Sequence, residues 1–433
     1  MKTSTILPAA ATATATATAT DLKITEITIT PIAFSDPPLL NAVGVHEPLV
    51  HRVVIEVRTG NGLLGLGECA GGQSRLDNLA VGANAIKGLS VFDTSLMEQL
   101  INEALDPALS SFERAAVFSA FEVAALDIQG HATGRSVSEL LGGTVRDEVP
   151  FSAYLFYKWA EHPELDGRPA ISDEWGEAMD PEGIVRQARR MIAEYGFKSI
   201  KLKGGVFPPA QEIEAIRALR GAFPDLPLRL DPNTAWTVET SKWVASQTEG
   251  LLEYLEDPTP GLEGMGQVAA SAAMPLATNM CVVSFDHIKR SVELDSVQVI
   301  LGDHHYWGGL RHTRELGTIC QTFGLGLSMH SNSHLGISLA AMVHVAAATP
   351  SLTYACDTHY PWNGHNDVIK PGVLRFVDGS VRVPAGPGLG VELDRERLAE
   401  LHLQYLEAKM TARDDTGYMQ RFVPEYTADL PRW

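Results

Sequence analysis

The first third of the chain alternates apolar and polar residues with a period of two. The alternation covers residues 24–29 and 53–58, and a Gly-Asn-Gly turn at 60–62 leads into a third run at 63–68. Alternation predicts half-buried β-strands, and this turn between two such runs is typical of a hairpin, so we expect an antiparallel meander. The loop at 39–51 between the first two strands is long and polar enough to form a lid.

A helical period follows the meander. Apolar residues between 111 and 133 recur at spacings of three and four, which predicts one helix. Together these elements predict a small α+β domain over residues 21–150, which we expect the segment of about 385–433 to complete, because that segment holds no further strand-helix unit. Residues 1–20 form an Ala-Thr repeat without a sustained apolar core, which predicts a disordered tail rather than a signal peptide.

Short apolar runs alternate with helical patterns from residue 151 to 384. Eight such runs lie at residues 151–154, 199–203, 228–231, 254–256, 276–279, 299–303, 327–330 and 354–357. This alternation predicts parallel βαβ units, which close into a TIM-type (β/α) barrel. The expected fold class is therefore α/β, a (β/α) barrel with an N-terminal α+β capping domain. Nearly every run ends in a polar residue, at the strand ends where such barrels carry their chemistry.

Composition narrows the range of partners. The chain has 433 residues and a formal net charge of -19, which argues against nucleic acid and anionic membranes as partners. Four cysteines are scattered without a CxxC pair, so we expect neither a zinc site nor a disulfide framework, and a reducing cytoplasm fits best. No apolar run reaches the roughly 18 residues of a membrane span.

Two lysines one residue apart end the second run of the barrel. Lys201 and Lys203 point to the same face of a strand because side chains alternate. Like charges this close lower at least one pKa, and a lysine with a pKa near ~7–8 can act as a general base. An exposed strand end with two solvated lysines would have the same sequence. The residues further along the chain must therefore distinguish a catalytic pair from a solvated one.

Oxygen-bearing side chains close three successive runs. Asp231, Glu256 and Asn279 would lie side by side in a closed barrel. Hard oxygen ligands without thiolate favour Mg²⁺ over zinc. Glu263, in the loop after Glu256, is a competing ligand that the sequence leaves open.

A carboxylate and an imidazole end the next two runs. Asp303 can hydrogen-bond one ring nitrogen of His330 and raise its basicity. His330 lies across the barrel mouth from Lys203, so one base could face each side of a single carbon. A divalent cation would stabilise the enediolate left by removal of an α-proton, and protonated His330 could help a β-hydroxyl to leave. The reaction class predicted is β-elimination or epimerisation of a hydroxy acid.

The motifs at these positions resemble the enolase superfamily and, within it, the glucarate dehydratases. They are KLKGGV in 197–206, LDPNTAW at 230–236, LEDP at 255–258, ATNM at 277–280, HSNSH at 330–334, DTH at 357–359 and ARDD at 412–415. The resemblance covers the chain from about residue 22 onward, and KxK together with HSN separates this subgroup from the muconate-cycloisomerase-like branch. Thr234 replaces the usual Gly, Ser333 replaces an Asn, and the loop after LEDP is slightly longer. These departures bear on substrate preference more than on reaction class.

The resemblance implies a role for each side chain. Lys203 would be one base and His330, backed by Asp303, both the other base and the acid. The side chains that would stabilise the enediolate are Lys201 and Asn332. The implied Mg²⁺ ligands are Asp231, Asn279 and either Glu256 or Glu263. The implied substrate contacts are Asn41, His46, Tyr154, Lys201, Asn233, Ser331, His359 and Arg413.

The reaction that the resemblance implies is a hydro-lyase reaction, the dehydration of D-glucarate and of its epimer L-idarate to 5-dehydro-4-deoxy-D-glucarate. A dianionic substrate fits Arg413 at one end and the metal with the lysines at the other. Two alternatives stay open: a dehydratase of another acid sugar such as galactarate, and a paralogue retained mainly as a sugar-acid binder. The intact Lys203, Asp303 and His330 argue against the second alternative. The resemblance also leads us to expect a homo-oligomer.

Overall fold

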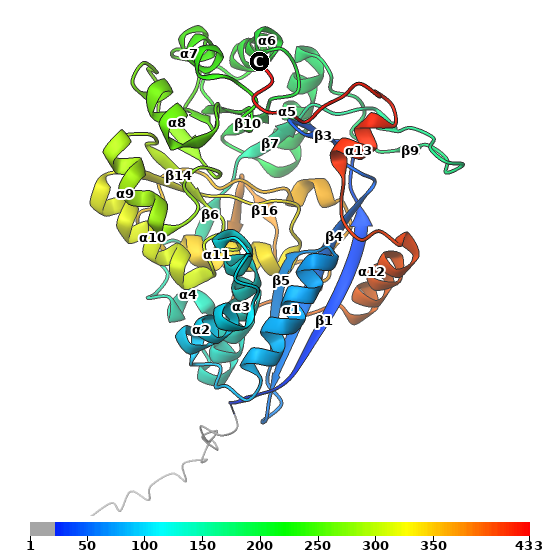
Figure 1. The fold of residues 1–433 in the computed structure, drawn as a ribbon, viewed down its shortest axis with the longest axis vertical. Coiled ribbons are helices and arrows are strands. Elements are labelled where there is room, and N and C mark those ends of the chain that lie inside the picture. The colour runs from blue at the N-terminus through cyan, green and yellow to red at the C-terminus, as the bar shows by residue number, and fades with distance from the viewer. Residues whose placement is uncertain (1–21) are drawn as a thin grey trace, which may run out of the picture.

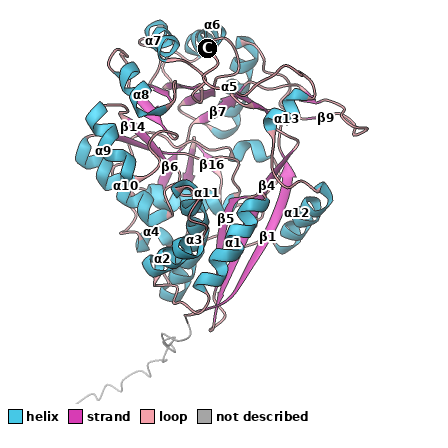
Figure 2. Ribbon diagram, in the orientation of Figure 1, coloured by secondary structure: helices cyan, strands magenta, loops and turns pink. Residues whose placement is uncertain are grey.

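The computed structural model describes residues 22–433, which form a lower capping part and an upper barrel part in Figures 1 and 2. In Figure 1 the capping part runs from blue to cyan and the barrel from green to orange. The predicted Ala-Thr tail of residues 1–20 lies outside the described residues. No helix among residues 22–433 is long and apolar enough to cross a membrane.

The capping part is built on the predicted meander. Its antiparallel sheet has the order β1 (Ile24–Ser35), β4 (Leu49–Thr59) and β5 (Leu64–Ala70). The predicted lid loop folds as a small hairpin of β2 (Leu40–Asn41) and β3 (Gly44–Val45). The antiparallel capping sheet of the predicted fold class is thus confirmed.

Helices of the capping part pack on this sheet and on one another. They are α1 (Gln73–Ile86), α2 (Thr94–Ala104), α3 (Ser111–Thr133) and the short α4 (Val137–Leu140). The bounds of α3 agree with the predicted helix; Ser110 caps its start and Gly134, with a φ of 67°, ends it. α3 lies unusually close to β5, because a Cβ at Gly65 would come within 2.1 Å of the Ala124 carbonyl oxygen.

Seven parallel strands form the curled sheet of the barrel, in the order β15-β14-β13-β12-β11-β10-β7. They are β7 (Ala153–Phe156), β10 (Ile200–Lys203), β11 (Leu228–Asp231), β12 (Tyr254–Glu256), β13 (Leu276–Thr278), β14 (Val299–Gly302) and β15 (Gly326–Met329). The helices around them are α5 (Pro181–Tyr195), α6 (Pro209–Ala222), α7 (Val238–Gln247), α8 (Gly261–Ala269), α9 (Phe285–Leu294), α10 (Leu310–Phe323) and α11 (Gly336–Ala348). The α/β barrel predicted from the alternating runs is confirmed.

The eighth predicted strand, residues 354–357, is not a strand. This segment forms one isolated parallel bridge, between Phe151 and Cys356, and the amide of Asp357 donates to the Met329 carbonyl at 2.9 Å. The carbonyl of Ala355 is taken by side chains, because Arg229 and Ser328 each donate to it at 2.8 Å. The segment therefore closes the ring between β15 and β7 without forming a regular ladder.

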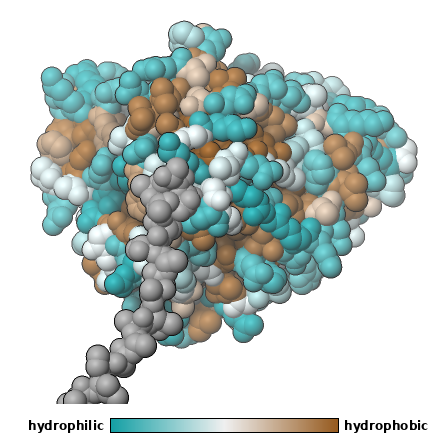
Figure 3. Space-filling model, turned by 90° about the horizontal axis from the view of Figure 1, so that it is seen from below, coloured by the Kyte–Doolittle hydropathy of each residue, from teal (hydrophilic) through white to brown (hydrophobic). Residues whose placement is uncertain are grey.

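The C-terminal residues contact both parts. α12 (Arg395–Ala408) packs on β1, where His402 donates to the Pro31 carbonyl at 2.7 Å, and α13 (Asp415–Gln420) packs on the β3 hairpin. The amide of Trp433 donates to the Ala235 carbonyl of the barrel at 3.1 Å. The minor elements are β6 (Glu148–Pro150), β8 (Glu161–His162), β9 (Ile171–Ser172), β16 (Phe376–Val377), β17 (Ser380–Arg382) and a 3₁₀ turn at Tyr360–Asn363. Figure 3 shows the face seen from below, where hydrophobic residues are interspersed among hydrophilic ones.

Candidate active site

Two adjoining cavities lie at the mouth of the barrel, under the capping hairpin. The larger has a volume of about 370 Å³, and the predicted site residues that line it are Asn41, His46, Tyr154, Lys203, Asn233, Asn332, His359 and Arg413. The smaller, of about 280 Å³, shares Lys203, Asn233 and Asn332 with the first and adds Asn279 and His330. Residues from distant parts of the sequence thus meet at one place, Lys203, Asn279 and His330 from the ends of barrel strands and Asn41, His46 and Arg413 from outside the barrel.

Carboxylates surround both lysines. Lys201 Nζ lies 2.7 Å from Glu256 Oε1 and 2.8 Å from Asp357 Oδ2, while Lys203 Nζ lies 2.7 Å from Asp231 Oδ2. Burial alone lowers a lysine pKa, but Asp357 and Glu256 outweigh it at Lys201, and Asp231 does so at Lys203, so both pKa values lie above the ordinary one. The prediction that one lysine has a lowered pKa is therefore wrong for this arrangement, since it weighed the two ammonium groups alone.

Three oxygen-bearing side chains end neighbouring strands next to these lysines. Asp231 and Glu256 are fully buried, and Asn279 lines the smaller cavity. Glu256 Oε2 accepts no hydrogen bond from the described residues, although Lys201 Nζ is 2.6 Å away. The backbone amide of Asn279 donates to Asp257 Oδ2 at 2.8 Å, which holds this residue in place. Two carboxylates and an amide oxygen in a buried cluster fit a hard divalent cation such as Mg²⁺.

Glu263 lies apart from this cluster. It sits in the first turn of α8, its side chain is 64% exposed, and Arg290 donates to it at 3.2 Å. Of the two alternatives that the sequence left open, the structure brings Glu256 to the cluster and leaves Glu263 on the outer face. The prediction of Glu263 as a competing ligand is not supported by this placement.

Asp303 and His330 lie close without forming an ordinary hydrogen bond. Asp303 Oδ2 is 3.5 Å from His330 Nδ1, and neither atom has a hydrogen-bond partner among residues 22–433. Burial lowers the pKa of His330 in spite of the neighbouring carboxylate. A neutral imidazole beside an ionised carboxylate can accept a proton and return it.

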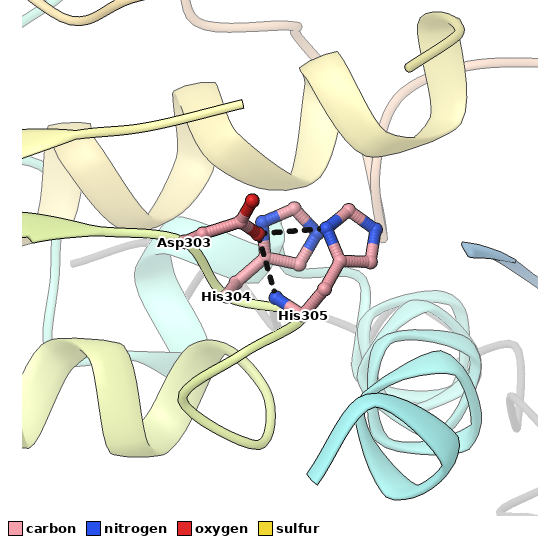
Figure 4. A group of neighbouring side chains, drawn as sticks. All are labelled: Asp303, His304 and His305. Atoms are coloured by element: carbon pink, nitrogen blue, oxygen red, sulfur yellow. Dashed lines mark hydrogen bonds and ion pairs between the residues drawn. The ribbon is translucent and has the colours of Figure 1, made fainter. Parts of the chain in front are cut away.

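The other oxygen of Asp303 binds a residue that the sequence analysis missed. Asp303 Oδ1 accepts from the amide of His305 at 2.9 Å and from its Nδ1 at 2.8 Å (Figure 4). His305 Nε2 lies 3.1 Å from the carbonyl oxygen of Glu68 in the capping part, and a carbonyl can only accept. The rings of His304 and His305 lie beside Asp303, with centroids 4.0 Å apart and planes tilted by 34° to each other. By distance alone the three side chains could hold a cation. Because both ring nitrogens of His305 face hydrogen-bond partners, we interpret this group as a support for Asp303 rather than a metal centre.

Ion pairs tie the capping hairpin to the C-terminal segment. Asp36 Oδ2 lies 3.0 Å from His46 Nδ1 and 2.8 Å from Arg413 Nη1, and Arg413 Nε donates to Asp415 at 2.6 Å. Burial alone would raise the pKa of Asp36, but His46 and Arg413 hold it below its ordinary value. Arg413 Nη2 is buried without a partner among the described residues, which leaves one donor for a ligand.

The remaining residues predicted to contact substrate lie at different depths in the site. Tyr154 lies beneath Lys201, whose Nζ is 4.7 Å from the ring centre. Asn332 donates to the hydroxyl of Tyr306. Ser331 is buried behind the cavity wall, where its hydroxyl accepts from the amide of His359 at 3.2 Å. The structure therefore gives Ser331 a supporting position.

Several polar residues near the site were not predicted as site residues, among them Tyr306, His51, Arg52 and His305. Tyr306, His51 and Arg52 line the larger cavity, and His305 supports Asp303. The available sequence signals were a His-Arg pair at the head of an apolar strand and two histidines directly after Asp303. Neither pair differs by spacing from ordinary structural residues, so only the tertiary structure reveals them.

Comparison with known proteins agrees with this architecture. Residues 24–142 match the family described as mandelate racemase / muconate lactonizing enzyme, N-terminal domain, and residues 183–397 match the family described as enolase C-terminal domain-like. The chain belongs to the enolase superfamily. Among its superfamily relatives, a protein of Streptomyces coelicolor named probable glucarate dehydratase is 50% identical over 95% of this chain and 99% of its own length.

Solved structures of enolase superfamily members superpose closely on this one. An enolase of Gibberella zeae complexed with magnesium, formate and sulfate has a TM-score of 0.92 and 58% identity, over 96% of this chain and 98% of its own. An enolase of Mycobacterium smegmatis complexed with tartrate has a TM-score of 0.91 and 61% identity, over 95% of this chain and 98% of its own. These values extend the similarity over both the capping part and the barrel.

Proposed function

We propose that this enolase superfamily enzyme catalyses the Mg²⁺-dependent dehydration of D-glucarate, and of L-idarate, to 5-dehydro-4-deoxy-D-glucarate. The observation that carries the proposal is the smaller cavity, which has Lys203 and His330 in its walls together with Asn279 and Asn332. Two groups able to exchange a proton therefore face one space beside a buried set of oxygen ligands. This arrangement suits the removal of a proton next to a carboxylate.

Similarity to known proteins supports the substrate class. The Streptomyces coelicolor relative carries the name probable glucarate dehydratase, and the Mycobacterium smegmatis structure contains tartrate, a dihydroxy diacid. The Gibberella zeae structure contains magnesium. A diacid that carries hydroxyl groups is thus the ligand class we assign to this site.

The residues of the chain divide the work of elimination. A Mg²⁺ ion held by Asp231, Glu256 and Asn279 would draw electron density from the substrate carboxylate and favour loss of the α-proton. Lys203 and His330 would face opposite sides of the α-carbon, so each would accept the proton from one epimer. Asp231 raises the pKa of Lys203, and a Mg²⁺ ion held by Asp231 would offset that effect and allow Lys203 to act as a base. The ammonium group of Lys201, buried at the base of the cluster, stabilises the negative charge that develops.

The leaving group requires a proton as well. When His330 has taken the α-proton, the protonated ring returns that proton to the oxygen of the β-hydroxyl as the C–O bond breaks, and the hydroxyl departs as water. The electron pair of the former C–H bond forms the new double bond, and the resulting enol becomes the keto product by gaining a proton at carbon and losing the proton of its hydroxyl group. Asp303, 3.5 Å from His330 Nδ1, stabilises the protonated ring before the transfer.

A direct assay tests the proposal. Purified protein is incubated with a panel of aldaric and aldonic acids, with Mg²⁺ or with EDTA, and 2-keto-acid formation is measured. We expect Mg²⁺-dependent turnover of D-glucarate and L-idarate. Turnover of another acid sugar alone would refute the substrate assignment but agree with the proposed type of reaction. No turnover of any acid in the panel would favour a binding role.

A variant tests the acid-base role separately. His330→Gln should abolish elimination from D-glucarate while Mg²⁺ binding, measured by calorimetry, stays intact. His344→Gln is the matched control, since His344 is equally buried but lies within α11 and lines neither cavity of the site. Full activity in His330→Gln would contradict the assignment.

A further inference from the structure

His51, in β4 of the capping part, lines the larger cavity, and none of the predicted roles was assigned to it. Its side chain is buried, with 7% of the residue exposed. Neither Nδ1 nor Nε2 has a hydrogen-bond partner among residues 22–433. On its other side the ring lies edge-on to Tyr405 of α12, with centroids 5.4 Å apart.

The other buried histidines of the capping side have partners. His46 Nδ1 lies 3.0 Å from Asp36, and His162 contacts the Asp36 carbonyl at 2.7 Å and the Tyr418 hydroxyl at 3.2 Å. Buried polar groups of native proteins are nearly always hydrogen-bonded, because an unpaired one loses its water without compensation. A buried imidazole with two unpaired nitrogens beside a cavity therefore suggests that the cavity supplies the partner.

Two further unpaired groups line the same cavity. Arg413 Nη2 and His359 Nδ1 are also buried without hydrogen-bond partners among the described residues. With His51, they come from three separate segments of the chain: β4, the loop after the barrel ring and the segment before α13. Unpaired polar groups from three segments at one cavity indicate a ligand with several oxygen atoms that can accept or donate hydrogen bonds.

Arg413 and His51 differ in their hydrogen-bonding chemistry. The guanidinium of Arg413 can only donate, which suits a carboxylate. Burial, and then the charge of Arg413, lowers the pKa of His51, which favours the neutral ring. A neutral imidazole has one N–H donor and one acceptor nitrogen, and a hydroxyl group, which both donates and accepts, complements it.

We propose that His51 is a specificity-determining residue that binds a hydroxyl group near the distal carboxylate of a hydroxylated diacid. The proposal rests on the proposed function for its reaction and substrate class, and extends it to the end of the substrate remote from Lys203. Asn332 and Ser333 also line this cavity, so His51 faces the same space as the loop in which Ser333 departs from the usual motif. The capping part thereby takes part in the choice of substrate.

Two substitutions test this role. His51→Leu removes both polar atoms at similar size, whereas His51→Gln keeps one donor and one acceptor. With D-glucarate and Mg²⁺, we expect kcat/KM to fall about tenfold in His51→Leu, the loss of one or two hydrogen bonds, and to recover most of that loss in His51→Gln. The wild-type protein and His162→Gln, altered at a histidine that does not line the cavity, are the controls.

Thermal unfolding without substrate separates a binding role from a structural one. His51→Leu should keep or raise the midpoint temperature, since it removes an unpaired buried polar group. If His51 had only a structural role, His51→Leu would lower the midpoint temperature, and His51→Gln would not recover activity. Unchanged kcat/KM in His51→Leu, or equal losses of stability and activity in both variants, would overturn the inference.

Failure of the proposed function gives a different result. It would appear as absent turnover of D-glucarate by the wild-type protein. The same variants are then compared on the acid sugar that the wild-type protein does turn over, or by calorimetric binding of D-glucarate if it turns over none. Absence of any binding by the wild-type protein would overturn both proposals.

Discussion

Glu68 joins the capping part to the barrel, and its replacement offers a sharp test of the structure. This carboxylate on β5 is 1% exposed. Its Oε1 accepts from Arg52 Nε at 2.9 Å and from the amide of Leu335 at 2.8 Å, and its Oε2 accepts from the amide of Ser338 at 2.9 Å. Glu68 thus caps the N-terminus of α11, directly after the loop that carries His330.

The expected loss follows from these contacts. Glu68→Leu leaves the buried guanidinium of Arg52 without its counter-ion, which costs roughly 3–5 kcal/mol. It also leaves the amides of Leu335 and Ser338 without their acceptor, which costs about 1–2 kcal/mol, as for a lost helix cap. We expect the free energy of unfolding to fall by roughly 4–7 kcal/mol in total.

A double-mutant cycle isolates the ion pair. Adding Arg52→Met to Glu68→Leu removes the unpaired charge, so the double variant should lose only about 1–2 kcal/mol relative to wild type. Urea titration followed by tryptophan fluorescence measures the three variants against wild type. A loss below about 1 kcal/mol in Glu68→Leu, or a double variant no more stable than the single one, would refute the reasoning.

Three further outcomes are expected. Burial lowers the pKa of His344 to about 4, below its unfolded value, so the stabilising effect of the neutral ring is complete above about pH 7 and is lost as the pH falls toward 4. Between pH 8 and pH 5, the free energy of unfolding measured by urea titration should fall by about 2 kcal/mol more in wild type than in His344→Gln. Thr234 has a φ of 61°, a strained conformation for a β-branched residue, so Thr234→Gly should raise the free energy of unfolding by about 0.5–1 kcal/mol, and a lower thermal midpoint would contradict this. In calorimetry, Asp231→Asn should lose Mg²⁺ binding and Glu263→Gln should retain it, with the reverse result assigning the ligand to Glu263.

The sequence predicted those features that depend on local periodicity. Strand-length runs and the helical period predicted the meander, α3 and seven barrel strands. The polar residues at strand ends predicted Lys203, Asn279 and His330 in the cavity walls, and the family resemblance predicted further lining residues such as His46, Tyr154 and Arg413. The eighth strand was wrong because side chains of Arg229 and Ser328 occupy the Ala355 carbonyl, and such long-range bonds leave no periodic signal.

The errors at the site have the same origin. The pKa prediction for Lys201 and Lys203 considered two adjacent charges and missed carboxylates that come from other strands, among them Asp357, 156 residues away. Likewise the positions of His51 at the larger cavity and of His305 beside Glu68 depend on tertiary contacts, which the sequence pattern does not predict.

The packing of α12 on β1 carries a consequence for the order of folding. His402 and Pro31, joined by a hydrogen bond, are 371 residues apart in the sequence. Contacts of such separation form slowly because a long loop must close first. During synthesis the first sheet leaves the ribosome long before α12 exists, so one side of β1 stays uncovered while the barrel is made. The capping part, encoded first, is therefore expected to mature last, and nascent chains that end before residue 395 should be the species that chaperones retain.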